Sequence, residues 1–160
     1  MITKVISGMQ TGADQGGLYG AKDAGISTGG TAPQSYYTEI GPDKKTAELF
    51  GLTECRVFGY PARTKINVAD SDGTLIIGNI ASPGCRLTKR LAAELGKPCY
   101  SVVYPRNQQI SVDEVAAWLD LYSIQVLNVA GNRESTNRGI FKFTRSFIKE
   151  LCEYSKVNHG

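Results

Sequence analysis

Short runs of aliphatic and β-branched residues alternate along this chain with longer stretches of helical periodicity. The short runs predict strands that end at Ile6 and that cover 74–77, 99–103 and 125–130. The longer stretches predict helices over about 12–24, 87–95, 111–121 and 139–154. Strands separated by helices indicate βαβ units, and near-continuous apolar strands are typical of a sheet covered on both faces. The pattern therefore predicts one α/β domain over residues 1–160, with a mainly parallel sheet flanked by helices.

The helix boundaries carry local signals. Gly25 follows the first helical stretch, where glycine commonly ends a helix. Ser111 is placed to cap the third helix, and Glu114 would complete a capping box with it. The segment from Gly29 to Arg63 is less regular and contains three tyrosines. It is interpreted either as a functional loop or lid, or as a peripheral excursion with short helices.

Composition narrows the possible chemistry. The single histidine, His159, is one residue from the C-terminus, which argues against a Ser-His-Asp triad and a histidine-based zinc site. The four cysteines form no C-x-x-C pair, and no apolar run is long enough to cross a bilayer. A net charge of +3 is too small to indicate a nucleic-acid partner. We therefore expect a cytoplasmic protein with reduced cysteines, no metal site, and neither a nucleic acid nor a membrane as partner.

Three loops with glycine and hydrogen-bonding side chains follow predicted strands. They begin at Ser7, Gly78 and Gly131. The carboxyl ends of parallel strands meet at one edge of a sheet, so these loops should converge. Glycines and helix N-termini suit an anion, and Arg86 and Arg133 could add charge-assisted hydrogen bonds. Taken alone, the first loop is equally compatible with phosphate binding and with a structural turn, since it matches no established phosphate-loop motif.

A further cluster precedes the strand at 74–77. Helical spacing predicts that Arg63, Asn67 and Asp70 share one face. Asp70 and Asp72 could serve acid–base chemistry or a metal ion. The favoured interpretation is that Asp70 pairs with a local arginine and that Asp72 serves the turn into the strand.

Four collinear motifs together resemble the molybdenum carrier family, within the SLOG superfamily of Rossmann-like domains. The motifs are Ser7-Gly8-Met9-Gln10-Thr11-Gly12-Ala13-Asp14, Gly29-Gly30, Asn67-Val68-Ala69-Asp70-Ser71-Asp72-Gly73-Thr74, and Leu127-Asn128-Val129-Ala130-Gly131-Asn132-Arg133-Glu134-Ser135. The resemblance spans about Val5 to Ile148. It implies a Rossmann-like sheet, a nucleotide-type pocket and homo-oligomers, either dimers or tetramers. Wider relatives include nucleotide-monophosphate phosphoribohydrolases and sensors of nucleotide-derived signals.

Motifs and loops together select the candidate ligand-binding residues. They are Ser7, Gly8, Gln10, Thr11, Gly12, Asp14, Gly29, Gly30, Arg63, Asn67, Asp70, Gly84, Cys85, Arg86, Gly131, Arg133, Glu134 and Ser135. Cys85 is also expected to be more reactive than Cys55 or Cys152, because a helix N-terminus lowers a thiol pKa.

The chain departs from its relatives in two places. The segment 29–34 lacks the family's cysteine and lysine, and Ser82-Pro83-Gly84-Cys85-Arg86 replaces a Thr-Gly-Gly-Thr-type loop. No carboxylate follows at 86–89 to match the catalytic glutamate of the phosphoribohydrolases. The departures favour binding over catalysis, so no catalytic residue and no certain cofactor are assigned.

Three functions remain open at this point. The first is binding of a nucleotide-derived, phosphate-bearing small molecule by a carrier or a sequestering protein. One form of it is a sponge for a cyclic ADP-ribose-type or other nucleotide immune signal, of use to a phage or mobile element. The second is carriage of a molybdenum cofactor. The third is a nucleotide N-glycosidase with Asp14, Asp70 or Glu134 as acid–base group.

Overall fold

Five parallel strands form the central sheet of the computed structural model, which describes residues 1–105 and 110–159. The strand order is β2-β1-β9-β7-β8, and every neighbouring pair is parallel. The strands are β1 (Lys4–Ile6), β2 (Ser27–Gly29), β7 (Gly73–Gly78), β8 (Cys99–Val103) and β9 (Val126–Gly131). This confirms the predicted parallel α/β domain; strand β2 was not predicted from the pattern.

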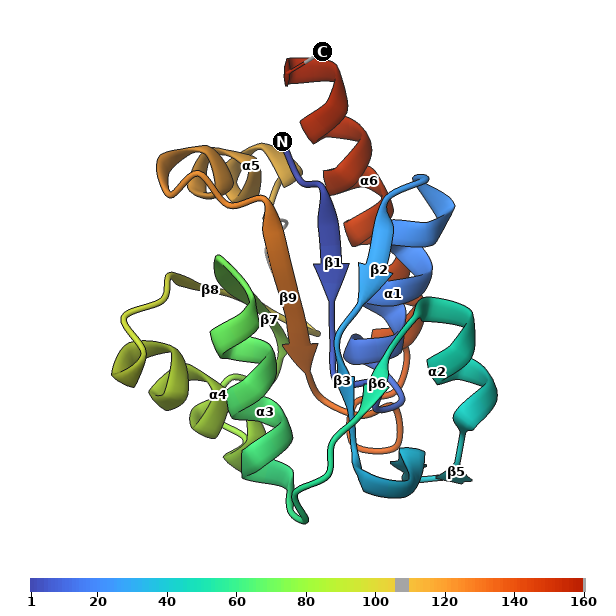
Figure 1. Ribbon diagram of the computed structural model, residues 1–160. Coiled ribbons are helices and arrows are strands. Elements are labelled where there is room, and N and C mark those ends of the chain that lie inside the picture. The colour runs from blue at the N-terminus through green and yellow to red at the C-terminus, as the bar shows by residue number, and fades with distance from the viewer. Residues whose placement is uncertain (106–109, 160) are drawn as a thin grey trace.

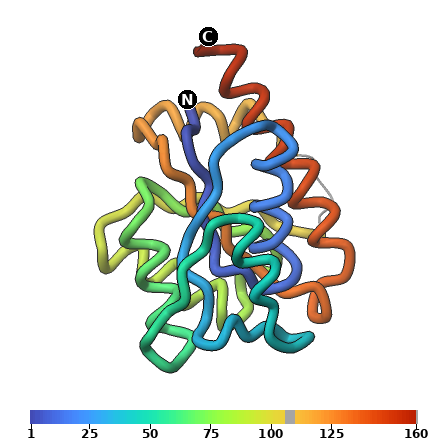
Figure 2. The backbone as a smooth tube through the Cα atoms, turned by 45° about the vertical axis from the view of Figure 1, so that its right-hand side comes forward, coloured from blue at the N-terminus to red at the C-terminus, as the bar shows by residue number. Residues whose placement is uncertain are grey.

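Helices cover both faces of this sheet (Figure 1). On one face lie α1 (Ala13–Asp23), α5 (Val112–Leu121) and α6 (Ile140–His159), and on the other lie α3 (Tyr60–Asp70) and α4 (Pro83–Glu94). Helices α1 and α6 run alongside each other, as the tube view also shows (Figure 2). The layers follow from right-handed crossovers. The connections through α1 (β1 to β2) and α5 (β8 to β9) run one way across the sheet, and those through α3 (β2 to β7) and α4 (β7 to β8) run the other way.

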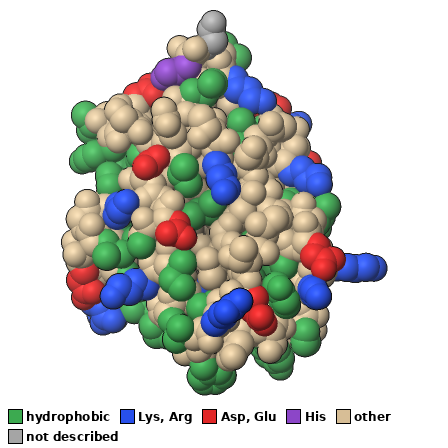
Figure 3. All heavy atoms as spheres, in the orientation of Figure 1, with side chains coloured by type: hydrophobic (Ala, Val, Ile, Leu, Met, Phe, Trp, Pro, Cys, Tyr) green, Lys and Arg blue, Asp and Glu red, His purple; other side chains and the backbone are tan. Residues whose placement is uncertain are grey.

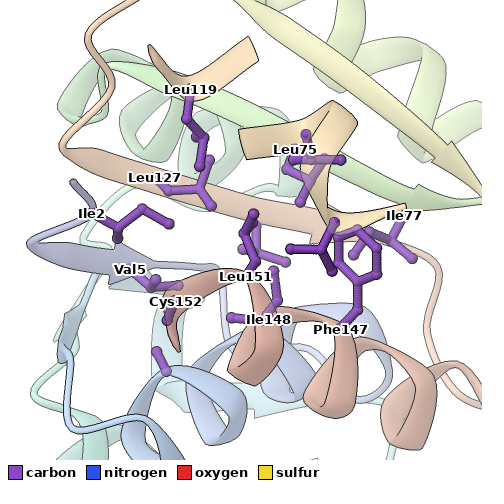
Figure 4. Close-up of a cluster of buried hydrophobic side chains, with 14 of the residues drawn as sticks. Ile2, Val5, Leu75, Ile77, Leu119, Leu127, Phe147, Ile148, Leu151 and Cys152 are labelled. Carbon is purple, nitrogen blue, oxygen red and sulfur yellow. The ribbon is translucent and has the colours of Figure 1, made fainter. Parts of the chain in front are cut away.

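The main hydrophobic core lies between the sheet and the α1–α5–α6 layer. In Figure 4, Leu75, Ile77 and Leu127 of the strands meet Phe147, Ile148 and Leu151 of α6. All six residues of β7 are buried, which explains the unbroken apolar run in its sequence. Each buried side chain of this size contributes about 1.5–3 kcal/mol, so this layer supplies a large part of the stability.

The segment between β2 and α3 is a peripheral excursion, as one of the two interpretations predicted. It contains β3 (Thr31–Ala32), the 3-10 helix η1 (Gln34–Tyr36), β4 (Tyr37–Thr38), β5 (Gly41–Pro42), α2 (Lys44–Phe50) and β6 (Thr53–Glu54). Strands β3 and β6 pair in parallel, and β4 and β5 form an antiparallel hairpin. Met9, Leu18 and Phe50 belong to a second apolar cluster that fastens this segment to α1.

Three predictions about helix ends were inaccurate. Helix α4 begins at Pro83, four residues before the predicted start, and α6 continues to His159. Ser111 does occupy the N-cap of α5, but its side chain caps nothing. The N–H of Glu114 donates to the Ser111 carbonyl instead (3.2 Å), so the predicted capping box does not form.

Candidate functional site

A cavity of about 460 Å³ opens where β1, β7 and β9 end, and the first turn of α4 forms one of its walls. The chain crosses the sheet in one direction after β1 and in the other after β7, and ligands commonly bind at such a switch point. We call it the switch-point cavity. Its lining residues are Gln10, Asp14, Tyr60, Asn79, Ser82, Pro83, Gly84, Leu87, Gly131, Asn132, Arg133 and Thr136.

The loop after β1 is held together by its own side chains. The N–H of Met9 donates to Ser7 Oγ (3.2 Å), that of Gln10 to Asp14 Oδ2 (3.2 Å) and that of Thr11 to Gln10 Oε1 (3.0 Å). These amides are therefore not available to cradle an anion. Of the six candidates in this loop and at the start of α1, only Gln10 and Asp14 line the cavity.

Gly12 lets two of the converging loops touch. It has φ +81°, and a Cβ there would lie 2.4 Å from the Asn132 carbonyl oxygen. That same carbonyl accepts the N–H of Ala13, the first residue of α1 (3.0 Å). The N-terminus of α1 is therefore capped by protein.

The N-terminus of α4, by contrast, is open to a ligand. Pro83 is its first residue and has no N–H, and the side chain of Ser82 does not cap the helix. The N–H groups of Gly84 and Cys85 form no hydrogen bond to any described residue, and Gly84 lines the cavity. Free amides and the helix dipole make this end attractive to an anion. Gly84 therefore places this helix end at the wall of the switch-point cavity.

The Cys85 thiol does not meet the expectation of a lowered pKa. Its side chain is buried (3% exposed), and Asn132 Nδ2 lies 3.7 Å from its sulfur. Burial raises the pKa of Cys85, so desolvation outweighs the helix N-terminus. Burial also raises the pKa of Cys152, to about 12.

Asn132 connects the walls of the cavity. Its Oδ1 accepts the N–H of Asn79 (2.6 Å) and its Nδ2 donates to Ser82 Oγ (3.0 Å). Gly78, with φ +137°, makes room for it, because a Cβ there would lie 2.2 Å from Asn132 Oδ1. One side chain thus ties the loop after β9 to the loop after β7 and to the N-cap of α4.

Asp14 and Arg63 form a buried ion pair beside the cavity. Arg63 Nη1 lies 3.4 Å from Asp14 Oδ2, and the side chains are 5% and 7% exposed, respectively. The guanidinium also lies over the Tyr60 ring, 4.7 Å from its centroid. Desolvation raises the pKa of Asp14 to about 6, against the opposing effect of Arg63. Asp14 is thus a carboxyl group that titrates near neutrality at the cavity wall.

Glu39, at the tip of the β4–β5 hairpin, fastens two of the site loops. Its carboxylate accepts hydrogen bonds from the hydroxyls of Thr11 and Ser135 and from the Ser135 N–H (3.2 Å). Although partial burial opposes it, these bonds lower the pKa of Glu39. Thr11 and Ser135 therefore serve this clamp and do not line the switch-point cavity.

Glu134, proposed above as an acid–base group, caps a helix instead. Its carboxylate accepts the N–H groups of Gly139 (2.7 Å) and Phe141 (2.9 Å) at the start of α6. A carboxylate at a helix N-terminus is stabilised by the helix dipole.

Several other candidates lie away from the cavity. Asp70 is exposed at the C-terminal end of α3, and among the described residues it forms no ion pair with an arginine. Asp72 accepts the N–H groups of Gln125 and Val126, so it anchors the start of β9. Arg86 is exposed on α4 and lines two outer grooves. Neither aspartate nor Arg86 reaches the switch-point cavity.

The remaining candidates contact neighbouring segments and do not line the switch-point cavity. Asn67 holds the backbone of Thr31 through both its amide atoms (2.8 and 3.0 Å). Gly30 packs against the backbone of Ser7, and Gly29 against Lys4. Gly8 makes room for Arg63, since a Cβ there would lie 1.3 Å from Arg63 Nη1. These residues therefore fix the positions of the segments around the cavity.

Sequence reasoning missed part of the lining and the Glu39 clamp. Asn79 and Asn132 lie in loops that were identified, and their position directly after strands was the available signal. Tyr60 is the first residue of α3, whose start was not predicted. Leu87 lies inside α4, at the position where that helix was predicted to begin. Glu39 lies in the irregular segment, where no periodicity pointed to it.

The described residues contain no cluster of three or more His, Cys, Asp or Glu side chains suited to a metal ion. None of the helices within 1–105 and 110–159 has the length and apolar character needed to span a bilayer. On the face shown in Figure 3, lysine and arginine side chains are interspersed with acidic ones. That face therefore presents no continuous basic surface.

Comparison with known proteins places the chain in a family. A family model described as Circularly permutated YpsA SLOG family matches residues 5–152. The crystal structure of a "Putative molybdenum carrier protein" from Syntrophus aciditrophicus SB superposes with a TM-score of 0.82 and 37% sequence identity, covering 94% of each chain. No curated protein matches the sequence. With its parallel sheet and its switch-point cavity, the chain belongs to the circularly permuted YpsA family of the SLOG superfamily.

Proposed function

We propose that the protein binds a nucleotide-derived, phosphate-bearing small molecule in the switch-point cavity and carries or sequesters it. The observation that supports this most is the open N-terminus of α4, where the Gly84 and Cys85 amides are unpaired and Gly84 lines the cavity. Arg133 lines the same cavity and supplies a positive charge. A volume of about 460 Å³ is within the range of small-molecule sites.

The carboxylates favour binding over cleavage. Glycosidases of the common kind use two carboxylates across the scissile bond. Among the described residues, Asp14 is the only carboxylate lining the switch-point cavity, because Glu134 caps α6 and Asp70 lies at the far end of α3. The N-glycosidase hypothesis thus retains one of its three proposed acid–base groups.

A molybdenum cofactor is the second candidate ligand. The observation in its favour is the structural similarity to the Syntrophus protein, whose name describes a molybdenum carrier. That cofactor is a pterin with a phosphate, so the same helix end would hold its anionic group. Capture of a nucleotide immune signal is a narrower form of the first proposal and rests on the same contacts.

Mass spectrometry of the small molecules released from the purified protein by heating distinguishes these ligands. We expect an intact phosphate-bearing nucleotide derivative. A released pterin would replace the first candidate by the second. Recovery of a free base together with a ribose phosphate, after incubation with a nucleotide, would support the enzyme and contradict binding without cleavage.

Replacing Arg133 tests whether this side chain helps to bind the phosphate group in the switch-point cavity. We expect Arg133→Ala to weaken binding of a phosphate-bearing ligand by about fivefold or more, equivalent to about 1 kcal/mol, because a charge-assisted hydrogen bond is lost. Isothermal titration calorimetry measures the affinity. Arg138→Ala is the matched control, since Arg138 is exposed nearby but lines a different groove. Equal affinities of the two folded variants would show that Arg133 does not contact the ligand.

A further inference from the structure

We propose that Asp14 and Arg63 form a subsite that recognises a hydroxyl group of the ligand's sugar. This inference rests on the proposed function and makes it more specific, because it identifies the ligand as a ribose phosphate derivative. It comes from the hydrogen-bonding capacity that these two buried side chains leave unused.

Arg63 supplies the donor. Its side chain is almost completely buried, and its one ion pair among the described residues is the 3.4 Å contact with Asp14. The Nε–H group is fully buried and has no partner. A guanidinium has five N–H donors, and leaving one of them buried and unpaired is costly. A group from outside the protein would satisfy this donor.

Asp14 supplies the acceptor. Both protein contacts of its carboxylate, from Arg63 and from the Gln10 N–H, go to Oδ2. Oδ1 accepts no hydrogen bond from a described residue, and Asp14 lines the switch-point cavity. The ion pair therefore leaves one acceptor, Asp14 Oδ1, and one donor, Arg63 Nε–H, without a partner among the described residues.

A small second cavity connects the pair to the main one. It has a volume of about 10 Å³ and its lining includes Asp14, Arg63 and Tyr60. Asp14 and Tyr60 line both cavities, so the small cavity is adjacent to the switch-point cavity. This volume is close to that of one water-sized probe, so it admits a single oxygen but not a phosphate group.

The chemistry of the small cavity matches a hydroxyl group. A hydroxyl both donates and accepts, so it can donate a hydrogen bond to Asp14 and accept one from the Nε–H of Arg63 at the same time. A phosphate would meet the repulsion of the Asp14 carboxylate. If the phosphate lies at the N-terminus of α4, a sugar hydroxyl is the part of a nucleotide that fits the small cavity.

The geometry of Arg63 is fixed by its neighbours. The guanidinium is stacked on Tyr60, and the absent Cβ of Gly8 leaves the space that Nη1 occupies. Such a fixed planar donor is well suited to reading the position of one oxygen. Arg63→Lys would keep the positive charge opposite Asp14 but remove the Nε–H donor.

Calorimetry with matched nucleotides tests the subsite. The probe is whichever of AMP, GMP, CMP and UMP binds the wild-type protein most tightly, compared with its 2′-deoxy and 3′-deoxy forms. We expect at least one deoxy form to bind at least tenfold more weakly. We also expect Arg63→Lys to reduce that preference at least threefold, while Arg56→Lys, a control at an exposed arginine outside both cavities, leaves it unchanged.

The outcomes separate the two proposals. Equal affinity for the ribonucleotide and both deoxy forms would mean that the small cavity holds only a water molecule, and the subsite would be refuted while nucleotide binding stood. A preference that Arg63→Lys leaves intact, with the variant folded by circular dichroism, would equally refute the role of Arg63. Binding of none of the four nucleotides, with no nucleotide derivative released on heating, would instead overturn the proposed function.

Discussion

At the scale of single residues, burial decides the chemistry of the site. Asp14 was selected from the sequence for its motif, but an isolated carboxyl has an ordinary pKa. In the folded chain, desolvation raises the pKa of Asp14 to about 6, and the neighbouring Arg63 only partly offsets this. The same effect reverses the expectation for Cys85, whose pKa is raised by burial. Sequence identifies the group, and its surroundings determine its protonation.

The raised pKa of Asp14 predicts a pH-dependent stability. The folded pKa of about 6 exceeds the ordinary 3.8, so the folded chain holds an extra proton between these values. The stabilisation is therefore complete below about pH 4 and is lost as the pH rises through 6. At about 1.4 kcal/mol per pKa unit, the loss is about 3 kcal/mol.

Urea denaturation of the wild type and of Asp14→Asn at pH 4, 5, 6 and 7.5 measures this loss. The wild-type free energy of unfolding should fall relative to that of the variant across this range, since asparagine does not titrate. A constant difference between the two proteins would show that Asp14 keeps its ordinary pKa in the fold.

At the scale of elements, side-chain hydrogen bonds hold the loops of the site against one another. Glu39 joins the loop after β1 to the loop after β9, and Asn132 joins the latter to β7 and α4. Gly12 and Gly78 permit these approaches, because a Cβ at either position would overlap with the neighbouring loop. The first loop thus acts mainly as scaffold, and the N-terminus of α4 is the anion-binding end that we propose.

Substitutions of the two glycines at the ends of α1 test whether the loop after β1 acts as a scaffold. Gly12 and Gly25 both have positive φ, +81° and +72°, but only Gly12 is crowded by backbone. We expect Gly25→Ala to cost about 1–2 kcal/mol, the strain of a left-handed alanine. Gly12→Ala should cost at least about 2 kcal/mol more, because its methyl group would overlap with Asn132 and Glu134. Equal losses in thermal or urea unfolding would mean that the loops can separate without cost.

At the scale of the whole molecule, the cavity exists only in the folded chain. Its lining comes from segments between Gln10 and Thr136, which meet because parallel strands end at one edge of the sheet. A ligand of this cavity therefore binds the folded state alone and must stabilise it. Homo-oligomerisation, implied by the resemblance, stays a prediction that the single chain does not address.

A thermal-shift titration measures how much a ligand stabilises the folded state. A nucleotide at one hundred times its dissociation constant should add about 2.7 kcal/mol of stability, which for a chain of this size raises Tm by about 5–10 °C. At the same concentration, Arg133→Ala should show a smaller shift. A nucleotide that binds in calorimetry without raising Tm would be binding somewhere other than this cavity.

The sequence by itself determined the layered α/β fold, the main strands and helices, and the edge of the sheet where the switch-point cavity opens. Hydrophobic periodicity and glycine positions are local signals, so a linear reading recovers them. Only the tertiary structure decided which candidates line the switch-point cavity. Thr11, Glu134 and Ser135 are used in clamps and caps, Asp70 and Arg86 lie elsewhere, and Asn79, Asn132 and Tyr60 line the wall. Most of those roles depend on burial and on contacts between segments far apart in the sequence, such as Asn132 with Asn79 and Ser135 with Glu39, and no local pattern encodes them. The cap formed by Glu134 is the exception, because its partners lie five and seven residues further along the chain.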